Sequence, residues 1–287
     1  MNNLKGVSKM DAQTRARYEK WKRNRIKRRI IFPGIGLLFA LIVLIVMIVS
    51  WGSEEDADDS SDIEPTVANE FESKTLPSEP TIYLFNAHPL EMIGSPFGNP
   101  YVGEMSIIEV THILAGYLES HGISTLVEEQ CVDAKLHRNS WEFYMSYYAA
   151  RYFVLDVIER YPSLDFFLDL HRDGIPHEYA TAEIDGRSYA RILFVIGTDN
   201  PIGYAASYAV ARELHDMLEE QKPGISRGVF TSGGSGRDGV YSQDISPMLQ
   251  LIELGTYTST VEEVSRTVEV LAEVLAEFLT LSNSDEE

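Results

Sequence analysis

The chain has almost no cysteine, because Cys131 is the only one among its 287 residues. A single thiol excludes an internal disulfide and any metal cluster built from several thiolates. The sequence also lacks an internal repeat. We therefore expect one folded domain of moderate size with accessory segments, held together without cross-links.

Positive charge is scarce beyond the first 29 residues. The chain has 24 Lys and Arg against 44 Asp and Glu, a formal net charge of −20. Residues 1–29 hold eleven of the basic residues and two acidic ones, so the rest of the chain carries a net charge of −29. Such an acidic main part argues against nucleic acid as its partner.

One long apolar run follows the basic segment directly. Residues 30–51 contain no charged side chain and are numerous enough to cross a hydrocarbon core of roughly 30 Å. Lys27 to Arg29 precede the run and Glu54 to Asp56 follow it, so the positive-inside rule predicts a cytoplasmic tail at 1–29 and an extracytoplasmic remainder. The run is too long for a cleaved signal peptide and no small-x-small site follows it. We expect an uncleaved, single-pass anchor in the cell membrane.

Residues 52–79 are rich in Asp, Glu, Ser and Pro and poor in large apolar side chains. This composition cannot bury enough surface to fold, so we expect an acidic, disordered linker. The folded domain is expected at 80–281, and residues 282–287 are expected to form a disordered acidic tail. The sequence therefore predicts an extracytoplasmic domain held on a tether.

Within 80–281, short apolar runs alternate with segments of helical periodicity. Strands are expected at 81–85, 123–127, 191–196 and 248–254, with one more ending at His171, and helices at 104–120, 141–161, 204–221 and 260–279. The alternation predicts an α/β fold with a mostly parallel central sheet flanked by helices. We interpret the tyrosines at 144, 147, 148 and 152 as core residues of the second helix rather than as a sugar-binding surface, with some of them bordering the groove.

Polar residues stand at the ends of three predicted strands. His88 and Glu91 follow the first strand, His171 ends the third, and Glu253 ends the last. The carboxyl ends of parallel strands lie along one edge of a sheet, so we expect these four side chains to converge. Two imidazoles and one carboxylate form the ligand set of many catalytic zinc sites, and a second carboxylate serves as general base. The sequence thus predicts a metal centre at this edge.

Several stretches, in order along about residues 80–280, resemble the stage II sporulation protein P family of membrane-anchored N-acetylmuramoyl-L-alanine amidases. They are Tyr83–Glu91, Ser146–Arg151, Asp169–Asp173, Phe194–Thr198, Ile225–Gly228, Tyr241–Asp244 and Leu251–Gly255. The resemblance implies Zn²⁺-dependent cleavage of the bond between the lactyl group of muramic acid and L-alanine in peptidoglycan. It also implies a role in cell-wall remodelling, including sporulation, with other wall-remodelling proteins as partners.

Matched residue by residue, the resemblance implies that His88, Glu91 and His171 bind the metal and that Glu253 is the catalytic carboxylate. Further matches, expected to support the site or bind substrate, are Arg172, Asp173, Arg227 and Gln243. Glu104 is the alternative third ligand, because zinc amidases of the broader class take a glutamate from the helix after the first strand. Two positions depart from the family pattern: Asn86 replaces the first histidine of His-x-His, and Ser242 replaces the asparagine of Tyr-Asn-Gln-Asp.

Two other functions use the same residues differently. A zinc carboxypeptidase or an amidohydrolase of another substrate would share the ligand set, with Arg172 or Arg227 binding a substrate carboxylate. A pseudoenzyme would bind the wall or a partner without cleaving. The intact His88, His171 and Glu253 argue against a pseudoenzyme.

Overall fold

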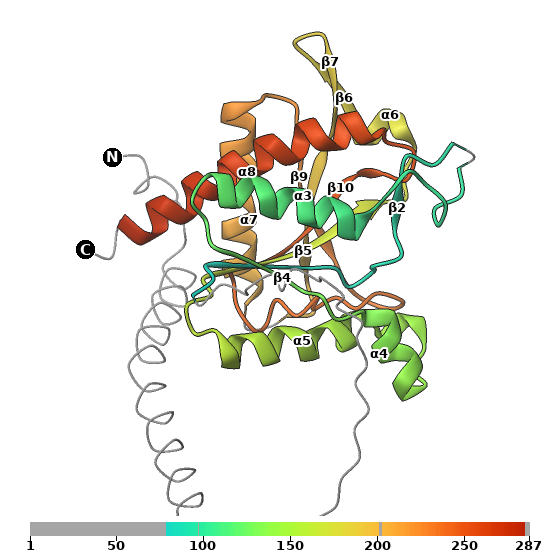
Figure 1. Ribbon diagram of the computed structural model, residues 1–287, viewed down its shortest axis with the longest axis vertical. Coiled ribbons are helices and arrows are strands. Elements are labelled where there is room, and N and C mark those ends of the chain that lie inside the picture. Colours follow the sequence, from blue (N-terminus) through green and yellow to red (C-terminus); the bar gives the residue numbers. More distant parts are fainter. Residues whose placement is uncertain (1–78, 97, 201–202, 285–287) are drawn as a thin grey trace, which may run out of the picture. The chain divides into compact units, whose positions relative to one another are not determined.

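The computed structural model of the protein describes residues 79–96, 98–200 and 203–284 (Figure 1). The predicted cytoplasmic tail, the apolar run at 30–51 and the linker up to residue 78 lie outside the described residues. Among the helices that are described, none has the length and apolar composition needed to cross a membrane.

A six-stranded sheet forms the centre of the domain, with strand order β4-β1-β5-β10-β8-β9. Its strands are Ile82–Phe85 (β1), Thr125–Val127 (β4), Phe166–Asp173 (β5), Ile192–Gly197 (β8), Ser226–Ser232 (β9) and Leu249–Thr256 (β10). Strands β4, β1, β5 and β10 run parallel to one another. The prediction of a mostly parallel central sheet is confirmed.

The last two strands of the sheet run in the opposite direction, which the sequence did not predict. Strand β8 pairs antiparallel with β10, and β9 pairs parallel with β8. A parallel return to the sheet requires a long crossover connection, usually a helix. Between β5 and β8 the chain instead forms the short helix α6 (His177–Ala180) and a hairpin of β6 (Thr181–Ile184) and β7 (Arg187–Ala190). The chain therefore re-enters the sheet from the end at which β5 left it.

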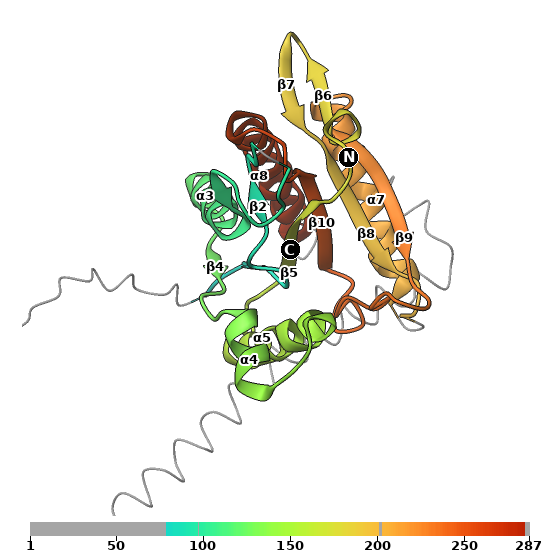
Figure 2. The same cartoon turned by 90° about the vertical axis from the view of Figure 1, so that its right-hand side faces the viewer.

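Helices cover both faces of the sheet (Figures 1 and 2). One face packs against α3 (Ile107–Ser120), α7 (Tyr204–Gln221) and α8 (Val261–Ser284), and the other against α4 (Val132–Asn139) and α5 (Ser146–Arg160). A 3₁₀ turn, η1 (Phe143–Met145), precedes α5. Alternate residues of β1 serve the two cores, Ile82 and Leu84 on the first face and Tyr83 and Phe85 on the second.

The boundaries of α3 follow from its capping residues. Ser106 and Glu109 form a reciprocal capping box, in which each side chain accepts a hydrogen bond from the backbone N–H of the other. Gly122, with φ of +80°, follows the helix end at Ser120 and His121. The predicted start at residue 104 was too early, because Met105 and Ser106 form β3 and pair with β2 (Met92–Ile93).

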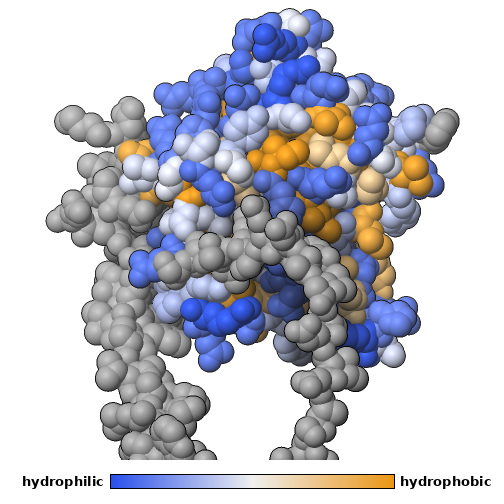
Figure 3. Space-filling view, viewed as in Figure 1, coloured by the Kyte–Doolittle hydropathy of each residue, from blue (hydrophilic) through white to orange (hydrophobic). Residues whose placement is uncertain are grey.

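The β6–β7 hairpin projects from the sheet (Figure 1), and its surface is mainly hydrophilic in the space-filling view (Figure 3). The hairpin tip has Asp185 and Gly186 at positive φ, of 53° and 73°. Two successive residues with positive φ are the geometry of a type I′ turn, whose twist matches that of the paired strands.

Two strands extend further than predicted, which corrects the expected positions of His171 and Glu253. Strand β5 continues to Asp173 and β10 to Thr256, so neither residue ends its strand. The ladder continues because the backbone groups of Asp173 and Thr256 still pair, after an irregularity that follows Glu253. Glu253 lies directly opposite His171 in this ladder. Paired residues of neighbouring strands present their side chains on the same face of the sheet.

Candidate metal centre

His88, Glu91 and His171 lie together at the carboxyl edge of β1 and β5. One ligand atom from each lies within 4.8 Å of the other two. Nδ1 of His88 is 3.6 Å from Oε1 of Glu91, and Nδ1 of His171 is 3.5 Å from Oε2 of the same carboxylate. A turn closed by the Glu91 N–H and the His88 carbonyl brings the first two residues together. Two imidazoles and one carboxylate at one point fit the three protein ligands of a catalytic zinc site.

Glu104, the alternative third ligand, lies elsewhere. Its side chain packs over Gly94, where an added Cβ would lie 3.1 Å from Cβ of Glu104. Its backbone N–H donates to the carbonyl of Ile93, which fixes it at the β2–β3 connection. The geometry therefore favours Glu91.

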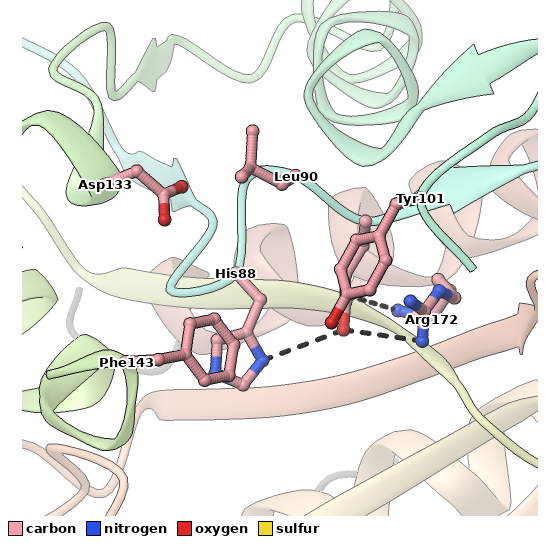
Figure 4. A pocket seen from close by; sticks show the side chains of 7 residues that line it. His88, Leu90, Tyr101, Asp133, Phe143 and Arg172 are labelled. Atoms are coloured by element: carbon pink, nitrogen blue, oxygen red, sulfur yellow. Dashed lines mark hydrogen bonds and ion pairs between the residues drawn. The ribbon is translucent and has the colours of Figure 1, made fainter. Parts of the chain in front are cut away.

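A pocket of about 230 Å³ opens at His88 and Glu91. Its other lining residues are Leu90, Tyr101, Asp133, Phe143 and Arg172 (Figure 4). Arg172 holds the Glu91 carboxylate in two ways: its backbone N–H donates to Oε2 at 3.0 Å, and its guanidinium lies 3.6 Å from Oε1. The carboxylate is thus presented to both imidazoles at the pocket floor.

The electrostatics of the three residues are strongly coupled. Burial alone would raise the pKa of Glu91, but hydrogen bonds with His171 and His88 and the charges of His171 and Arg172 hold this pKa well below its usual range. Burial alone would lower the pKa of His171, but the Asp169 and Glu91 carboxylates raise it well above its usual range.

Asp169 supports His171 from behind, and the sequence reasoning missed it. Its Oδ1 lies 2.9 Å from Nε2 of His171 and accepts a hydrogen bond of 2.9 Å from the backbone N–H of Ala87, next to His88. A carboxylate at the outer nitrogen of a ligand histidine fixes the tautomer and the ring orientation. The only signal in the sequence was an aspartate at an inward position, two residues before His171, within an otherwise apolar strand.

Glu253 lies on β10 beside His171, as the strand register requires. Its Oε2 is buried and has no hydrogen-bond partner among the described residues. Burial, together with the charges of Glu91 and Asp173, raises the pKa of Glu253 to about 8, against the opposing effect of His171 and Arg227. An unpartnered carboxylate oxygen beside the ligand set is the position that a general base requires.

Tyr147 of α5 covers the centre, which the helical pattern alone did not distinguish from ordinary core. Its ring centroid lies 5.0 Å from that of His88, 5.8 Å from that of His171 and 4.9 Å from that of Tyr241. Burial, followed by the charges of Asp169 and Glu253, raises the pKa of Tyr147 well above its usual value. Its hydroxyl therefore stays protonated and can only act as a neutral hydrogen-bonding group.

A sequence model of the stage II sporulation protein P family matches residues 49–276 of the chain. This chain belongs to the stage II sporulation protein P family. The stage II sporulation protein P of Bacillus subtilis (strain 168) is 36% identical over 161 residues, which are 56% of this chain and 40% of that protein. The match therefore covers less than half the length of this relative.

Solved structures similar to the chain include the N-acetylmuramoyl-L-alanine amidase AmiC2 of Nostoc punctiforme, with 13% identity, a TM-score of 0.40 and coverage of 72% of this chain and 99% of that one. The CwlD amidase from Clostridioides difficile, in complex with the GerS lipoprotein, has 11% identity, a TM-score of 0.45 and coverage of 70% and 99%. Murine aminoacylase 3 has 15% identity, a TM-score of 0.38 and coverage of 72% and 67%.

Asn86 and Ser242, the two positions that depart from the family pattern, bear on the course of the backbone near the site. Asn86 donates from Nδ2 to the Leu170 carbonyl at 2.7 Å and to Thr111 Oγ1 at 2.9 Å, so it ties the end of β1 to β5 and α3. Ser242 has φ of +58°, in the left-handed region, where asparagine is the more favourable of the two residues. Neither residue belongs to the group of converging ligand atoms.

The remaining matched residues divide between the site and its support. Asp173 and Arg227 form an ion pair of 2.8 Å near Glu253. Gln243 is buried, accepts from the N–H of Gly197 at 2.9 Å and donates to the carbonyl of Val195 at 2.8 Å. It therefore fastens the loop that carries Tyr241 to β8, and its amide is used for support rather than for substrate.

The first prediction concerns the third ligand. In the full-length protein, Glu91→Ala should remove most zinc binding at neutral pH, because it deletes one of three converging donors, whereas Glu104→Ala should leave zinc content near one ion per chain. Metal content after dialysis measures both. Zinc loss in Glu104→Ala with full retention in Glu91→Ala would exchange their roles.

The second prediction concerns Asp169. Asp169→Asn keeps the side-chain shape and an acceptor for Ala87 but loses the charge beside His171, so zinc affinity should fall by about 10–100-fold. Competition with a chromogenic chelator gives the affinity. Asp156→Asn, at an exposed position of α5, is the matched control and should bind zinc like the wild type. Unchanged affinity in Asp169→Asn would limit Asp169 to holding the backbone of Ala87.

Proposed function

We propose that this protein is a membrane-tethered, zinc-dependent N-acetylmuramoyl-L-alanine amidase, which hydrolyses the amide between the lactyl group of muramic acid and L-alanine in peptidoglycan. The observation that carries the proposal is the convergence of His88, Glu91 and His171 next to the unpartnered carboxylate of Glu253, in a chain of the stage II sporulation protein P family. The names of the similar amidases are consistent with this reaction.

The donor set fits zinc by its chemistry. Two imidazoles and a carboxylate suit Zn²⁺, and the outer nitrogen of His171 already has its carboxylate partner in Asp169. Zn²⁺ held by His88, Glu91 and His171 would polarise the scissile carbonyl and lower the pKa of a water molecule. The pocket at His88 and Glu91 leaves room for substrate on the side away from Asp169.

Side chains of the protein then carry out the proton transfers and position the substrate and the ligands. Glu253 accepts at Oε2 the proton of the attacking water and returns it to the leaving nitrogen of L-alanine. Asp169 keeps the His171 ring in place through both steps. Arg172 lines the pocket with a positive charge that suits the carboxylates of a stem peptide. Tyr147 closes the inner side and excludes water.

We further propose that the protein acts in cell-wall remodelling during sporulation, with its domain outside the cell membrane and with other wall-remodelling proteins as partners. The family supports the sporulation setting. The basic residues before the apolar run at 30–51 and the acidic residues after it support the orientation.

The third prediction concerns Glu253. Glu253→Gln keeps the size of the side chain and its hydrogen-bonding capacity but removes the base, so hydrolysis should slow by about 10²–10⁴-fold. Zinc content should stay normal, because Glu253 is not among the converging ligands. New L-alanine amino termini released from purified sacculi measure the rate. Glu183→Gln, exposed on the β6–β7 hairpin, is the control and should keep full activity.

The outcomes of that assay separate the alternatives. Activity equal to that of the wild type would remove Glu253 from the reaction, and loss of zinc along with activity would make it a ligand. Amino termini other than L-alanine would indicate a peptidase or an amidohydrolase of different specificity. A wild type that binds sacculi but releases no amino termini under any condition would be a wall-binding protein.

The fourth prediction concerns topology. Protease added to intact protoplasts should degrade the chain beyond about residue 52 and leave residues 1–29 protected, because the basic flank is expected to remain in the cytoplasm. Antibodies against each end of the chain detect the fragments. Protection of the folded domain in intact protoplasts would contradict the extracytoplasmic assignment.

A further inference from the structure

A set of aromatic side chains lies exposed along α5 and the turn before it, where the sequence had predicted core. The exposed fraction is 56% for Phe143, 78% for Tyr144, 44% for Tyr148 and 43% for Tyr152. Of the four tyrosines interpreted as core, only Tyr147 turns toward the sheet. The interpretation as core is wrong for the other three: Tyr144 lies on the turn η1 before the helix, and Tyr148 and Tyr152 lie on α5 away from its buried residues Ala149, Ala150 and Phe153.

The rings of Trp141, Tyr148 and Tyr152 contact one another, and we call these three, together with Phe143 on the turn before α5, the aromatic strip. The centroid of Trp141 lies 5.3 Å from that of Tyr148 and 5.9 Å from that of Tyr152, and the two tyrosine rings are 5.2 Å apart. The two tyrosine hydroxyls are 2.8 Å apart. Nζ of Lys135 lies 4.5 Å from the centroid of Tyr152, which helps to fix that ring. The strip is therefore an ordered surface rather than a set of separate side chains.

The strip begins at the candidate metal centre. Phe143 lines the pocket and stacks on His88, with centroids 5.0 Å apart and an angle of 22° between the rings. From Phe143 to Tyr152 the strip extends over roughly 14 Å, at about 1.5 Å per residue. This length has room for more than one pyranose ring. In Figure 4, Phe143 and Arg172 lie on opposite sides of His88, with Tyr101 beside Arg172, so the positive charge of the pocket lies at the end away from Phe143.

We propose that the aromatic strip binds the glycan strand of peptidoglycan and so presents the lactyl amide to the metal centre. The inference rests on the proposed function and names the part of the substrate that this surface takes. A pyranose ring has an apolar C–H face and a rim of hydroxyls, and tyrosine and tryptophan offer an apolar face with a polar edge. The uncharged sugars fit the end at Phe143, whereas the stem peptide, with its carboxylates, fits the end at Arg172.

The charges around the strip disfavour an anionic membrane as the occupant. Asp156 and Glu159 are exposed on the same helix, where Arg160 pairs with Asp156, and the basic group that contacts the strip is that of Lys135; the chain beyond residue 29 is strongly acidic. A helix that binds a bilayer surface carries basic residues beside its apolar face, since anionic lipid repels carboxylates.

The test measures binding separately from hydrolysis. Full-length protein in nanodiscs of zwitterionic lipid is titrated calorimetrically with soluble glycan strands from which the stem peptides have been removed. Tyr148→Ala combined with Tyr152→Ala should weaken this binding by about tenfold or more, because it removes two stacking faces. Tyr148→Phe combined with Tyr152→Phe keeps both faces and should stay within a few-fold of the wild type. Tyr179→Ala, at an aromatic position 63% exposed on α6, should have no effect.

Equal glycan affinity in the wild type and the double alanine variant would overturn the inference. The phenylalanine variant preserves the rings and so tests the inference even where the alanine variant fails to fold. If the phenylalanine variant binds no glycan while the wild type does, the inference is also overturned. A second measurement uses vesicles of anionic lipid. If the double alanine variant loses binding to these vesicles while its glycan affinity is unchanged, the strip is a membrane-facing surface. If the wild type binds glycan through the strip but hydrolyses no sacculi, the amidase proposal is wrong and the glycan-binding inference stands. If the wild type hydrolyses sacculi and its glycan affinity does not change when the strip is mutated, only the glycan-binding inference is wrong.

Discussion

The register between β5 and β10 is the constraint on which the candidate site depends. It places Glu253 opposite His171 on adjacent parallel strands, so the proposed general base and one proposed metal ligand share one face of the sheet. A shift of one residue would send Glu253 to the opposite face, toward the core under α8. The buried residues that alternate along both strands resist such a shift, because Phe167 and Leu249 belong to one core and Leu168 and Ile252 to the other. Packing far below the site thus fixes its chemistry.

The pKa values of Glu91 and Glu253 are shifted in opposite directions, and the cause is the number of partners that each carboxylate has. Glu91 accepts from the Arg172 backbone and faces both imidazoles, so its charged form is stabilised despite burial. Glu253 is half-buried and its Oε2 is buried without a partner among the described residues, so its neutral form is favoured and its pKa is raised to about 8. A divalent cation would add positive charge beside both carboxylates and shift the balance of Glu253 toward its ionised form. Glu91, with its lowered pKa, is therefore ionised at neutral pH, the form in which a carboxylate binds a cation.

The sequence was informative where a polar residue interrupts an apolar strand, and less so where spatial neighbours decide. His88, Glu91, His171 and Glu253 could be expected to meet because parallel strands share a carboxyl edge. Asp169 could not be separated from an ordinary strand residue, since its role arises from the ring of His171 and from Ala87 on another strand. The reversal of β8 was equally hidden, because it follows from a hairpin that replaces a crossover helix and not from the pattern of β8 itself.

Helix α5 shows how a single stretch of sequence serves both the interior of the site and its outer surface. Tyr147 and Tyr148 are consecutive, and successive residues on a helix with 3.6 residues per turn point about 100° apart. Tyr147 therefore reaches the two ligand histidines while Tyr148 joins the exposed rings of Trp141 and Tyr152. One turn along α5 from Tyr147, Arg151 forms a bidentate ion pair with Asp244, so α5 is tied to the loop after Tyr241 on the side of Tyr147. Because Tyr147, Tyr148 and Tyr152 belong to one helix, a rotation of α5 that moved Tyr147 away from the two histidines would turn Tyr148 and Tyr152 by the same angle.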